Sequence, residues 1–183
     1  MGPPFCFTAT SCILPSPQIK QLDMQPDNFR IESASVGDIP LLVTFIKELA
    51  SYEKLLQIVN VTEDRLRIAL FGLQPRAHAV IGYCDQSPVA FAIYFFNFST
   101  FEGLPGLYIE DIFVRPAFRG SGFGRRLFEF LAQRARQENC SRVELSVLNW
   151  NEHAIQFYKR LGGEPVTGWT VFRFPEKVLN NFT

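Results

Sequence analysis

The sequence predicts an α/β fold in which a mixed, largely antiparallel sheet is flanked by helices. Three observations favour this class. Apolar runs of strand length alternate along the chain with segments whose apolar residues follow helical spacing. A polar turn at 85–87 joins two of these runs and is typical of an antiparallel hairpin. A glycine-containing loop at 115–122 follows another run and opens a helix.

The individual elements follow from these patterns in chain order. Apolar runs predict strands at 29–33, 77–84, 88–97, 107–114, 142–147 and 170–174, with a loop at 101–106. Helical spacing predicts helices from 39 to about 52, 63 to about 71, about 122 to about 138 and 152 to 161. Ser35 with Asp38, Thr62 and Asn151 are the expected N-terminal caps, and Gly72 ends the second helix.

The length of 183 residues suits one domain, which can bury a core without disulfides or metals. Residues 1–28 contain five prolines and no periodic pattern, so we expect a flexible N-terminal extension. Residues 29–183 are the predicted folded domain.

Composition excludes several function classes. The formal net charge is 0, whereas a nucleic-acid binder usually carries a basic excess. No apolar run approaches the roughly 20 residues of a membrane span. Four cysteines without a C-x-x-C pair and only two histidines, His78 and His153, predict no metal site. The stretch before Lys20 lacks basic residues and is interrupted by prolines, unlike a secretion signal, so we expect a cytoplasmic protein.

The segment most informative about function is Arg119 to Gly124, which reads Arg-Gly-Ser-Gly-Phe-Gly. A dinucleotide fingerprint would need glycine where Arg125 stands, and the Gly-Lys-Ser/Thr of a Walker A loop is absent. The pattern that fits is R-x-x-G-x-G. Glycines let backbone N–H groups close around a phosphate, and the helix that follows directs its dipole at the same anion. Arg115, Arg119, Arg125 and Arg126 are expected to add positive charge there, so a pyrophosphate is the natural occupant.

This loop resembles the acetyl-CoA loop of the GNAT superfamily of N-acetyltransferases, and the match extends through almost the whole chain after residue 29. Within the superfamily the sequence is similar to the spermidine/spermine (diamine) N-acetyltransferase group. The segments that carry the resemblance are IKELASYE at 46–53, VAFAIYFFNFSTFEG at 89–103, LYIEDIFV at 107–114, RGSGFG at 119–124 and WNEHAIQFYKRLG at 150–162.

The resemblance implies a cofactor site for acetyl-CoA, used as a co-substrate, at a splay between strands 107–114 and 142–147. The strand before the loop would offer backbone groups to the pantetheine arm, the loop would hold the pyrophosphate, and the next helix would hold the cofactor from its other side. The implied residues are Ile112, Phe113, Val114, Arg119, Gly120, Ser121, Gly122, Phe123, Gly124, Arg125, Asn151, Glu152 and Ala154.

Two residues occupy the family's catalytic positions. Glu110 stands where the family has its general base, which a substrate amine needs because at a pKa near 10 roughly one in a thousand molecules is neutral at pH 7. Tyr158 stands at the general-acid position, facing a leaving thiol with a pKa of about 8.5. A regular pleat would turn Asp111 to the opposite face of the strand from Glu110. We expect direct attack by the amine in a ternary complex.

On the substrate side the resemblance implies Tyr52, Glu53, Glu110 and Trp169. Further acidic positions of the polyamine enzymes are Leu56, Gln57 and Thr167 here, which favours a short diamine or a basic amino acid over spermine. A protein N-acetyltransferase and a non-catalytic acyl-CoA-binding module stay open as alternatives. The resemblance also implies a homodimer.

Overall fold

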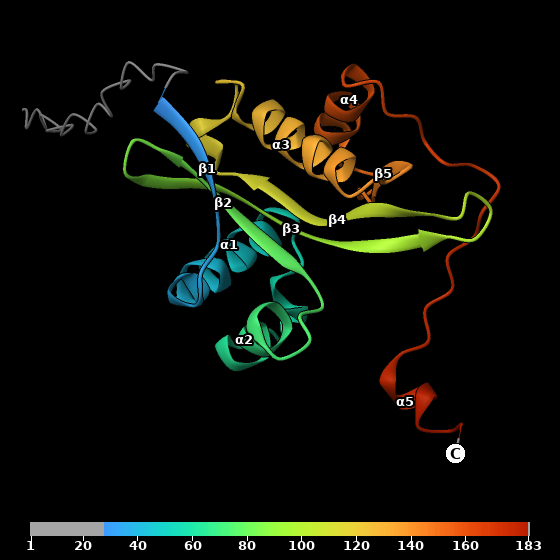
Figure 1. Cartoon of the computed structure of the whole chain (residues 1–183). Helices are drawn as coiled ribbons and strands as arrows, with labels where there is room; N and C mark the ends of the chain where they lie inside the picture. The colour runs from blue at the N-terminus through green and yellow to red at the C-terminus, as the bar shows by residue number, and fades with distance from the viewer. Residues whose placement is uncertain (1–27, 183) are drawn as a thin grey trace, which may run out of the picture.

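The computed structural model describes residues 28–182, in which five strands form one sheet in the order β1-β2-β3-β4-β5 (Figure 1). The strands are β1 (Phe29–Ser33), β2 (His78–Cys84), β3 (Ser87–Ser99), β4 (Leu104–Val114) and β5 (Arg142–Leu145). The first four pair antiparallel, and β5 pairs parallel with β4. The predicted α/β fold with a mixed, largely antiparallel sheet is therefore confirmed.

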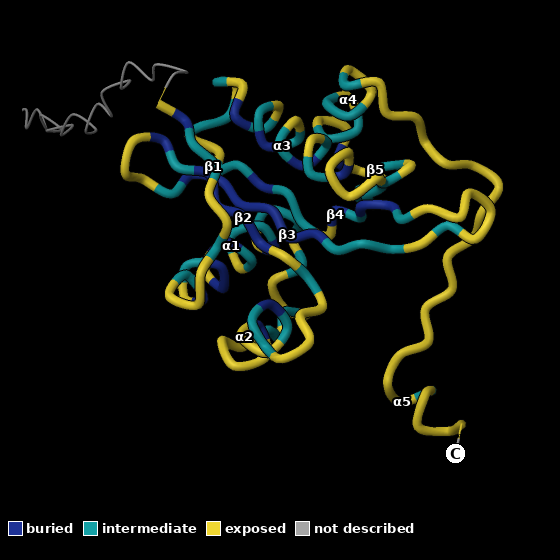
Figure 2. Tube along the Cα trace, viewed as in Figure 1, coloured by how far each residue is buried: buried dark blue, intermediate teal, exposed yellow. Residues whose placement is uncertain are grey.

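Helices cover both faces of the sheet and divide the core into two layers. The helices are α1 (Ile39–Tyr52), α2 (Glu63–Phe71), α3 (Phe123–Gln137), α4 (Glu152–Arg160) and α5 (Glu176–Leu179), with short 3-10 turns η2 (Val36–Asp38), η3 (Leu56–Ile58) and η4 (Pro116–Phe118). On one face, Leu127 and Leu131 of α3 pack on Leu107 and Ile109 of β4. On the other, α1 and α2 pack on a layer that includes Phe113. Figure 2 shows this buried strip along the middle of the sheet.

The predicted helix starts are confirmed in their capping contacts. Asp38 accepts hydrogen bonds from the backbone N–H and the hydroxyl of Ser35, at 2.8 and 2.7 Å. The Thr62 hydroxyl oxygen accepts from the Arg65 N–H, and the Asn151 side chain accepts from the Ala154 N–H. The Thr62 and Asn151 contacts each satisfy an N–H that the first turn of α2 or α4 leaves unpaired. The Ser35–Asp38 contacts cap the short turn η2 that leads into α1.

The pairing of β3 with β4 contains a β-bulge at Glu110. Ile93 lies opposite Asp111 and the next residue, Tyr94, lies opposite Ile109, so Glu110 is the extra residue on β4. A bulge reverses the alternation of side chains along its strand. Accordingly, Leu107 and Ile109 face the α3 layer before the bulge, and Ile112 and Val114 face it afterwards.

Several predicted strand bounds shift, and one predicted strand does not form. β3 spans Ser87–Ser99 instead of 88–97. β4 begins at Leu104, inside the expected loop, because it stays paired with β3 to the end of the hairpin. β5 ends at Leu145 instead of residue 147, because it separates from β4 there. The expected strand at 170–174 does not form, since the segment runs away from the sheet without a strand partner (Figure 1).

The predicted N-terminal extension, residues 1–28, lies outside the described residues except for Asn28. Among the described residues, no helix is long and apolar enough to cross a membrane.

Candidate active site

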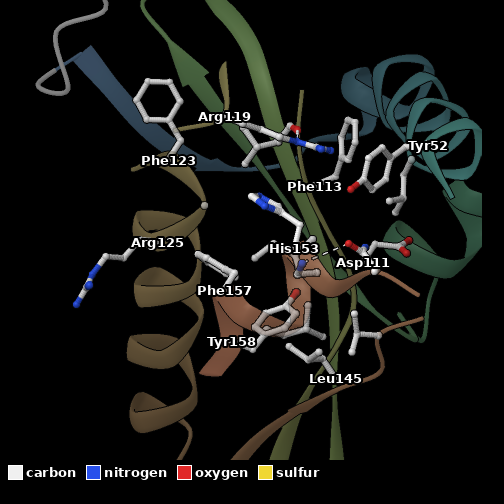
Figure 3. Close-up of a pocket in the computed structure, with 18 of the residues that line it drawn as sticks. Tyr52, Asp111, Phe113, Arg119, Phe123, Arg125, Leu145, His153, Phe157 and Tyr158 are labelled. Atoms are coloured by element: carbon white, nitrogen blue, oxygen red, sulfur yellow. Dashed lines mark hydrogen bonds between the residues drawn. The ribbon is translucent and has the colours of Figure 1, made fainter. Parts of the chain in front are cut away.

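A pocket of about 370 Å³ opens where β4 and β5 separate. The two strands pair only from Gly106 to Ile109 on β4 and from Arg142 to Leu145 on β5. Beyond that point β4 continues as one wall of the pocket, residues 110–114, while the chain after β5 forms another with Ser146 and Val147. The start of α3, one side of α4 and the end of α1 complete it (Figure 3). The expected splay between these strands is confirmed.

The glycine loop borders this pocket at the N-terminus of α3. Gly120 and Gly122 have φ of 85° and 81°, a left-handed conformation that only glycine adopts without strain. A Cβ atom at either position would meet no atom within 4 Å, so their Cα atoms face open space. Gly124 lies against Phe157 of α4. The loop therefore leaves room for an anion at the start of a 15-residue helix.

The first turn of α3 is fixed from beneath by aromatic packing. The ring of Phe123, directly after Gly122, stacks on Phe29 with centroids 4.3 Å apart. Both residues are buried. This contact ties the glycine loop to β1, on the far edge of the sheet from β5, and so holds the helix N-terminus in place.

The four arginines around the loop have different partners. Arg115 forms two 2.8 Å contacts with Glu48 and donates to the Pro88 carbonyl, and Arg126 donates to the Phe29 carbonyl. Glu48 compensates the charge of Arg115, which corrects the expectation that this residue adds charge at the loop. Arg126 is held against Phe29, and neither arginine lines the pocket. Arg119 lines the pocket, but its guanidinium lies 4.2 Å from the ring centroid of Tyr52.

Arg125 also borders the pocket, although its guanidinium is turned outward. The side chain forms a 2.8 Å ion pair with Glu129 and points away from the cavity in Figure 3. Within the loop, the available groups are therefore mainly backbone N–H groups and the helix dipole.

The bulge places two adjacent carboxylates in the pocket. Glu110 and Asp111 both line it, and the predicted opposite orientation of Asp111 is wrong because the bulge interrupts the pleat between them. Glu53, at the end of α1, lines the same pocket. The only sequence signal for the bulge is a shift of the apolar positions, from 107 and 109 to 112 and 114.

Burial and mutual repulsion alter the acid–base properties of this group. The pKa of Asp111 rises to about 6, first because the carboxyl is buried and then because Glu110 and Glu53 are nearby. Burial also raises the pKa of Glu53. Carboxylates that repel one another in a partly dry pocket are stabilised by a cation or a proton, so the site suits an ammonium group.

Tyr158 reaches the pocket from α4, across from β4. Its ring packs against Phe157 and Phe128. Burial, and then the charge of Glu53, raise the pKa of the Tyr158 hydroxyl to about 12, so it is protonated throughout the neutral range. The hydroxyl is a hydrogen-bond donor that faces the same space as Asp111 (Figure 3).

Aromatic rings gather around Tyr52, the residue before Glu53 at the end of α1. Tyr52 lies 6.5 Å from Phe113 and 6.3 Å from Trp150, between ring centroids. The Lys54 ammonium lies 5.8 Å from the centroid of the Trp150 ring. Trp150 was not singled out from the sequence, although it belongs to the segment that carries the resemblance.

The structure brings most of the predicted site residues together. Those that line the pocket are Tyr52, Glu53, Glu110, Ile112, Phe113, Val114, Arg119, Gly120, Gly122, Phe123, Gly124, Arg125, Asn151, Ala154 and Tyr158. Three do not: Ser121 lies outside the lining, Glu152 accepts a hydrogen bond from Gln156 at 2.6 Å, and Trp169 is 75% exposed beyond α4. The lining residues that the analysis of the sequence did not assign to the site are Asp111, His153, Phe157, Arg160, Leu49, Ile109, Phe118, Leu145, Ser146 and Val147.

No group of three or more metal-ligating side chains was found among residues 28–182.

Comparisons with known proteins identify the family. The acetyltransferase (GNAT) family model matches residues 46–163. The thialysine N-epsilon-acetyltransferase of Bos taurus is 37% identical over 160 residues, 81% of this chain and 94% of that protein. The human spermidine/spermine N(1)-acetyltransferase-like protein 1 is 32% identical over 163 residues, 84% of this chain but 23% of that longer protein.

The solved structure of an integron cassette protein from the mobile metagenome of V. cholerae superposes with a TM-score of 0.71 at 25% identity, over 84% of this chain and 96% of the other. The chain belongs to the acetyltransferase (GNAT) family and is an N-acetyltransferase. This decides against the alternative of a non-catalytic acyl-CoA-binding module.

The carboxylate group makes a prediction about titration. In the free enzyme, the side-chain carboxyl carbon of Asp111 should titrate near pH 6 by NMR. Glu110→Gln removes a neighbouring negative charge and should lower that pKa, whereas Glu129→Gln, on the exposed side of α3, should leave it unchanged. A titration near pH 4, or one insensitive to Glu110→Gln, would contradict the described geometry.

Proposed function

We propose that the enzyme transfers an acetyl group from acetyl-CoA to the primary amine of a short basic substrate, either a lysine-like amino acid or a diamine, by direct attack in a ternary complex. The observation that carries the proposal is the convergence of Glu53, Glu110, Asp111 and Tyr158 on one pocket beside the glycine loop. Carboxylates on one side and a phenol on the other suit removal of a proton from an ammonium and donation of one to a leaving thiol.

The residues present fit acetyl-CoA. The open space in front of Gly120 and Gly122 and the free N-terminus of α3 suit a pyrophosphate. Residues 112–114 of β4 extend past the last residue paired with β5, so their backbone can hold a pantetheine arm through strand-like hydrogen bonds. We propose that Asn151 and Ala154 contact the cofactor from α4. When bound, acetyl-CoA supplies a thioester carbonyl that an amine can attack.

Glu110 and Asp111 are the proposed groups for the incoming amine. They bind the ammonium form by charge and accept its proton, directly or through water. A carboxyl with a pKa near 6 is a better proton acceptor at neutral pH than one of ordinary pKa. We therefore extend the base function expected of Glu110 to the pair, with Asp111 as the stronger base.

Tyr158 is the proposed donor to the leaving sulfur. A hydroxyl with a pKa of about 12 is a weak acid toward a thiolate, whose conjugate acid has a pKa of about 8.5. Because the charge of Glu53 contributes to that high value, an ammonium group paired with Glu53 lowers the pKa of Tyr158. Substrate binding thereby prepares Tyr158 to stabilise the thiolate by hydrogen bonding and proton donation.

The expected size of the substrate needs a different argument from the one the sequence suggested. Asp111 joins Glu53 and Glu110 in the pocket, so the pocket holds one more carboxylate than the resemblance implied. These groups lie around the reacting end, whereas Leu56 and Gln57 of η3 leave the adjoining surface uncharged. The substrate named for the bovine relative, thialysine, supports a basic amino acid as acceptor.

Cytoplasmic localisation and the homodimer stay predictions.

Substrate class is tested by a panel of amines. Thiol release at fixed acetyl-CoA should give a higher kcat/KM for thialysine, ornithine or a short diamine than for spermine, because extra ammonium groups find no further carboxylates. Peptides with an N-terminal or lysine amine should react at least tenfold more slowly than the best free amine. A kcat/KM for spermine tenfold above that for every short amine would show that a polyamine is the preferred substrate. Faster acetylation of peptides would favour a protein N-acetyltransferase.

Cofactor placement is tested by Gly122→Glu. The substitution forces a side chain into a left-handed position and adds a negative charge where the pyrophosphate is proposed to lie. Calorimetry should show the dissociation constant of acetyl-CoA rising at least tenfold. Glu138→Gln, at the C-terminal end of α3, serves as a control that keeps affinity. Unchanged affinity in Gly122→Glu would refute this placement.

The proposed role of Tyr158 is tested by Tyr158→Phe, which removes only the hydroxyl. Acetyl-CoA affinity and melting temperature should be nearly unchanged, while the turnover number falls by roughly 100-fold. A turnover number within twofold of wild type, under conditions where chemistry limits the rate, would exclude proton donation by Tyr158.

A further inference from the structure

The end of α1 carries a lysine in a backbone conformation that lysine rarely adopts. Lys54 has a φ of 61°, in the left-handed region. The other non-glycine residues of 28–182 with positive φ are Asp85 and Asn139, whose short polar side chains tolerate it better. The Leu55 N–H donates to the Ala50 carbonyl at 2.8 Å and closes the helix around Lys54, a position where glycine is usual. Backbone strain of this kind points to a function for the side chain that it carries.

Lys54 stands at the rim of the pocket, where the end of α1 meets the start of α4. It directly follows Glu53, and Trp150 directly precedes Asn151; Glu53 and Asn151 both line the pocket. The ring of Trp150 lies beside that of Tyr52, which faces the pocket (Figure 3). The Lys54 ammonium lies 5.8 Å from the centroid of the Trp150 ring. These contacts hold a positive charge on the part of the rim next to Glu53.

This ammonium is available to a ligand. None of the ion pairs among residues 28–182 includes Lys54, and the residue is exposed. Its contact with Trp150 is close to the roughly 6 Å limit of a cation–π interaction. A carboxylate makes shorter and stronger hydrogen bonds to an ammonium group than an aromatic face does. A carboxylate at the rim can therefore draw Lys54 away from the ring.

The other cation beside Tyr52 is held differently. The guanidinium of Arg119 lies over the rings of Tyr52 and Phe113, and its Nε donates to the Val114 carbonyl at 3.0 Å. Arg119 also belongs to the glycine loop, where the pyrophosphate is proposed to lie. Lys54 is thus the cation that the end of α1 offers to the acceptor substrate.

We propose that Lys54 binds the α-carboxylate of a basic amino acid whose side-chain amine reacts beside Glu110 and Asp111, while Glu53 binds the α-ammonium of the same substrate. The inference rests on the proposed function and chooses the amino acid over the diamine as its substrate. Glu53 and Lys54 are adjacent and opposite in charge, as are the two groups on the α-carbon of an amino acid. The pair therefore complements a zwitterion.

The same pair discriminates against a diamine. A diamine brings a second ammonium group to the rim but no carboxylate, so Glu53 attracts it and Lys54 repels it. Selectivity commonly needs such a repulsive element in addition to an attractive one. An amino acid satisfies both charges, and its α-ammonium offsets the Glu53 charge that helps to raise the pKa of Tyr158.

Steady-state kinetics with one matched pair of substrates tests the role of Lys54. Thialysine and the diamine formed by its decarboxylation differ only in the carboxylate. The wild type should have a kcat/KM at least tenfold higher for thialysine. Lys54→Gly should lower this preference at least tenfold, chiefly by raising the KM for thialysine, because the contact is made in the ground state and the transition state alike. Lys54→Arg keeps the charge and should keep the preference. Lys47→Gln removes an exposed cation elsewhere on α1 and is the control.

The fold provides a second readout for the same variant. Glycine suits a φ of 61°, so Lys54→Gly should have a melting temperature equal to or above that of the wild type. An equal loss of activity on both substrates, with a lower melting temperature, would assign Lys54 a structural role and overturn the inference. A wild type without preference, or a preference unchanged in Lys54→Gly, would overturn it and leave the proposed function intact. A wild type that acetylates neither compound would overturn both.

Discussion

The separation of β4 from β5 after Ile109 is the constraint on which the rest of the site depends. Parallel pairing over four residues holds the strands together at one end, and the shorter β5 then stops while β4 continues. The gap is the pocket, and the two helices that follow these strands close it, α3 with its N-terminus and α4 with Tyr158. The separation of the two strands thus places an unpaired strand edge, the N-terminus of α3 and the Tyr158 hydroxyl around the same pocket. Phe29 stacked on Phe123 keeps the helix N-terminus fixed against the sheet while the strands diverge.

The bulge at Glu110 determines which carboxylates face the pocket. By turning Glu110 and Asp111 to one face, it gathers carboxylates that a regular strand would separate. The arrangement has a cost in stability. Asp111 keeps its proton up to about pH 6 in the folded protein but only to about 3.8 when unfolded. Between these values the native state binds more protons, so the contribution of this group to stability falls as pH rises through the window. At neutral pH the ionised carboxylate of Asp111 lowers the stability of the folded protein but favours the binding of an ammonium group.

Much of this architecture could be predicted from the sequence, because the patterns that specify it are local. Ser35 and Asp38 specify a helix start through residues three apart, and Gly120 and Gly122 specify a left-handed turn that other residues avoid. The errors share another origin. The orientation of Asp111 depends on how β3 pairs with β4, and the structural contacts of Arg115 depend on Glu48, 67 residues away. The segment at 170–174 has the composition of a strand, but a strand needs a neighbour, and none of its own chain's described strands pairs with it.

The central claim is that β4, beyond its pairing with β5, and the glycine loop together hold acetyl-CoA. Hydrogen exchange of the backbone amides, measured with and without acetyl-CoA, tests this claim. The account predicts slower exchange at two separate places, residues 112–114 of β4 and residues 120–125 at the start of α3, with the loop effect lost in Gly122→Glu. Amides of β2, on the other side of β3 from the pocket, should exchange at the same rate in both states. Protection confined to other segments, or absent from both of these places at saturating acetyl-CoA, would contradict the account.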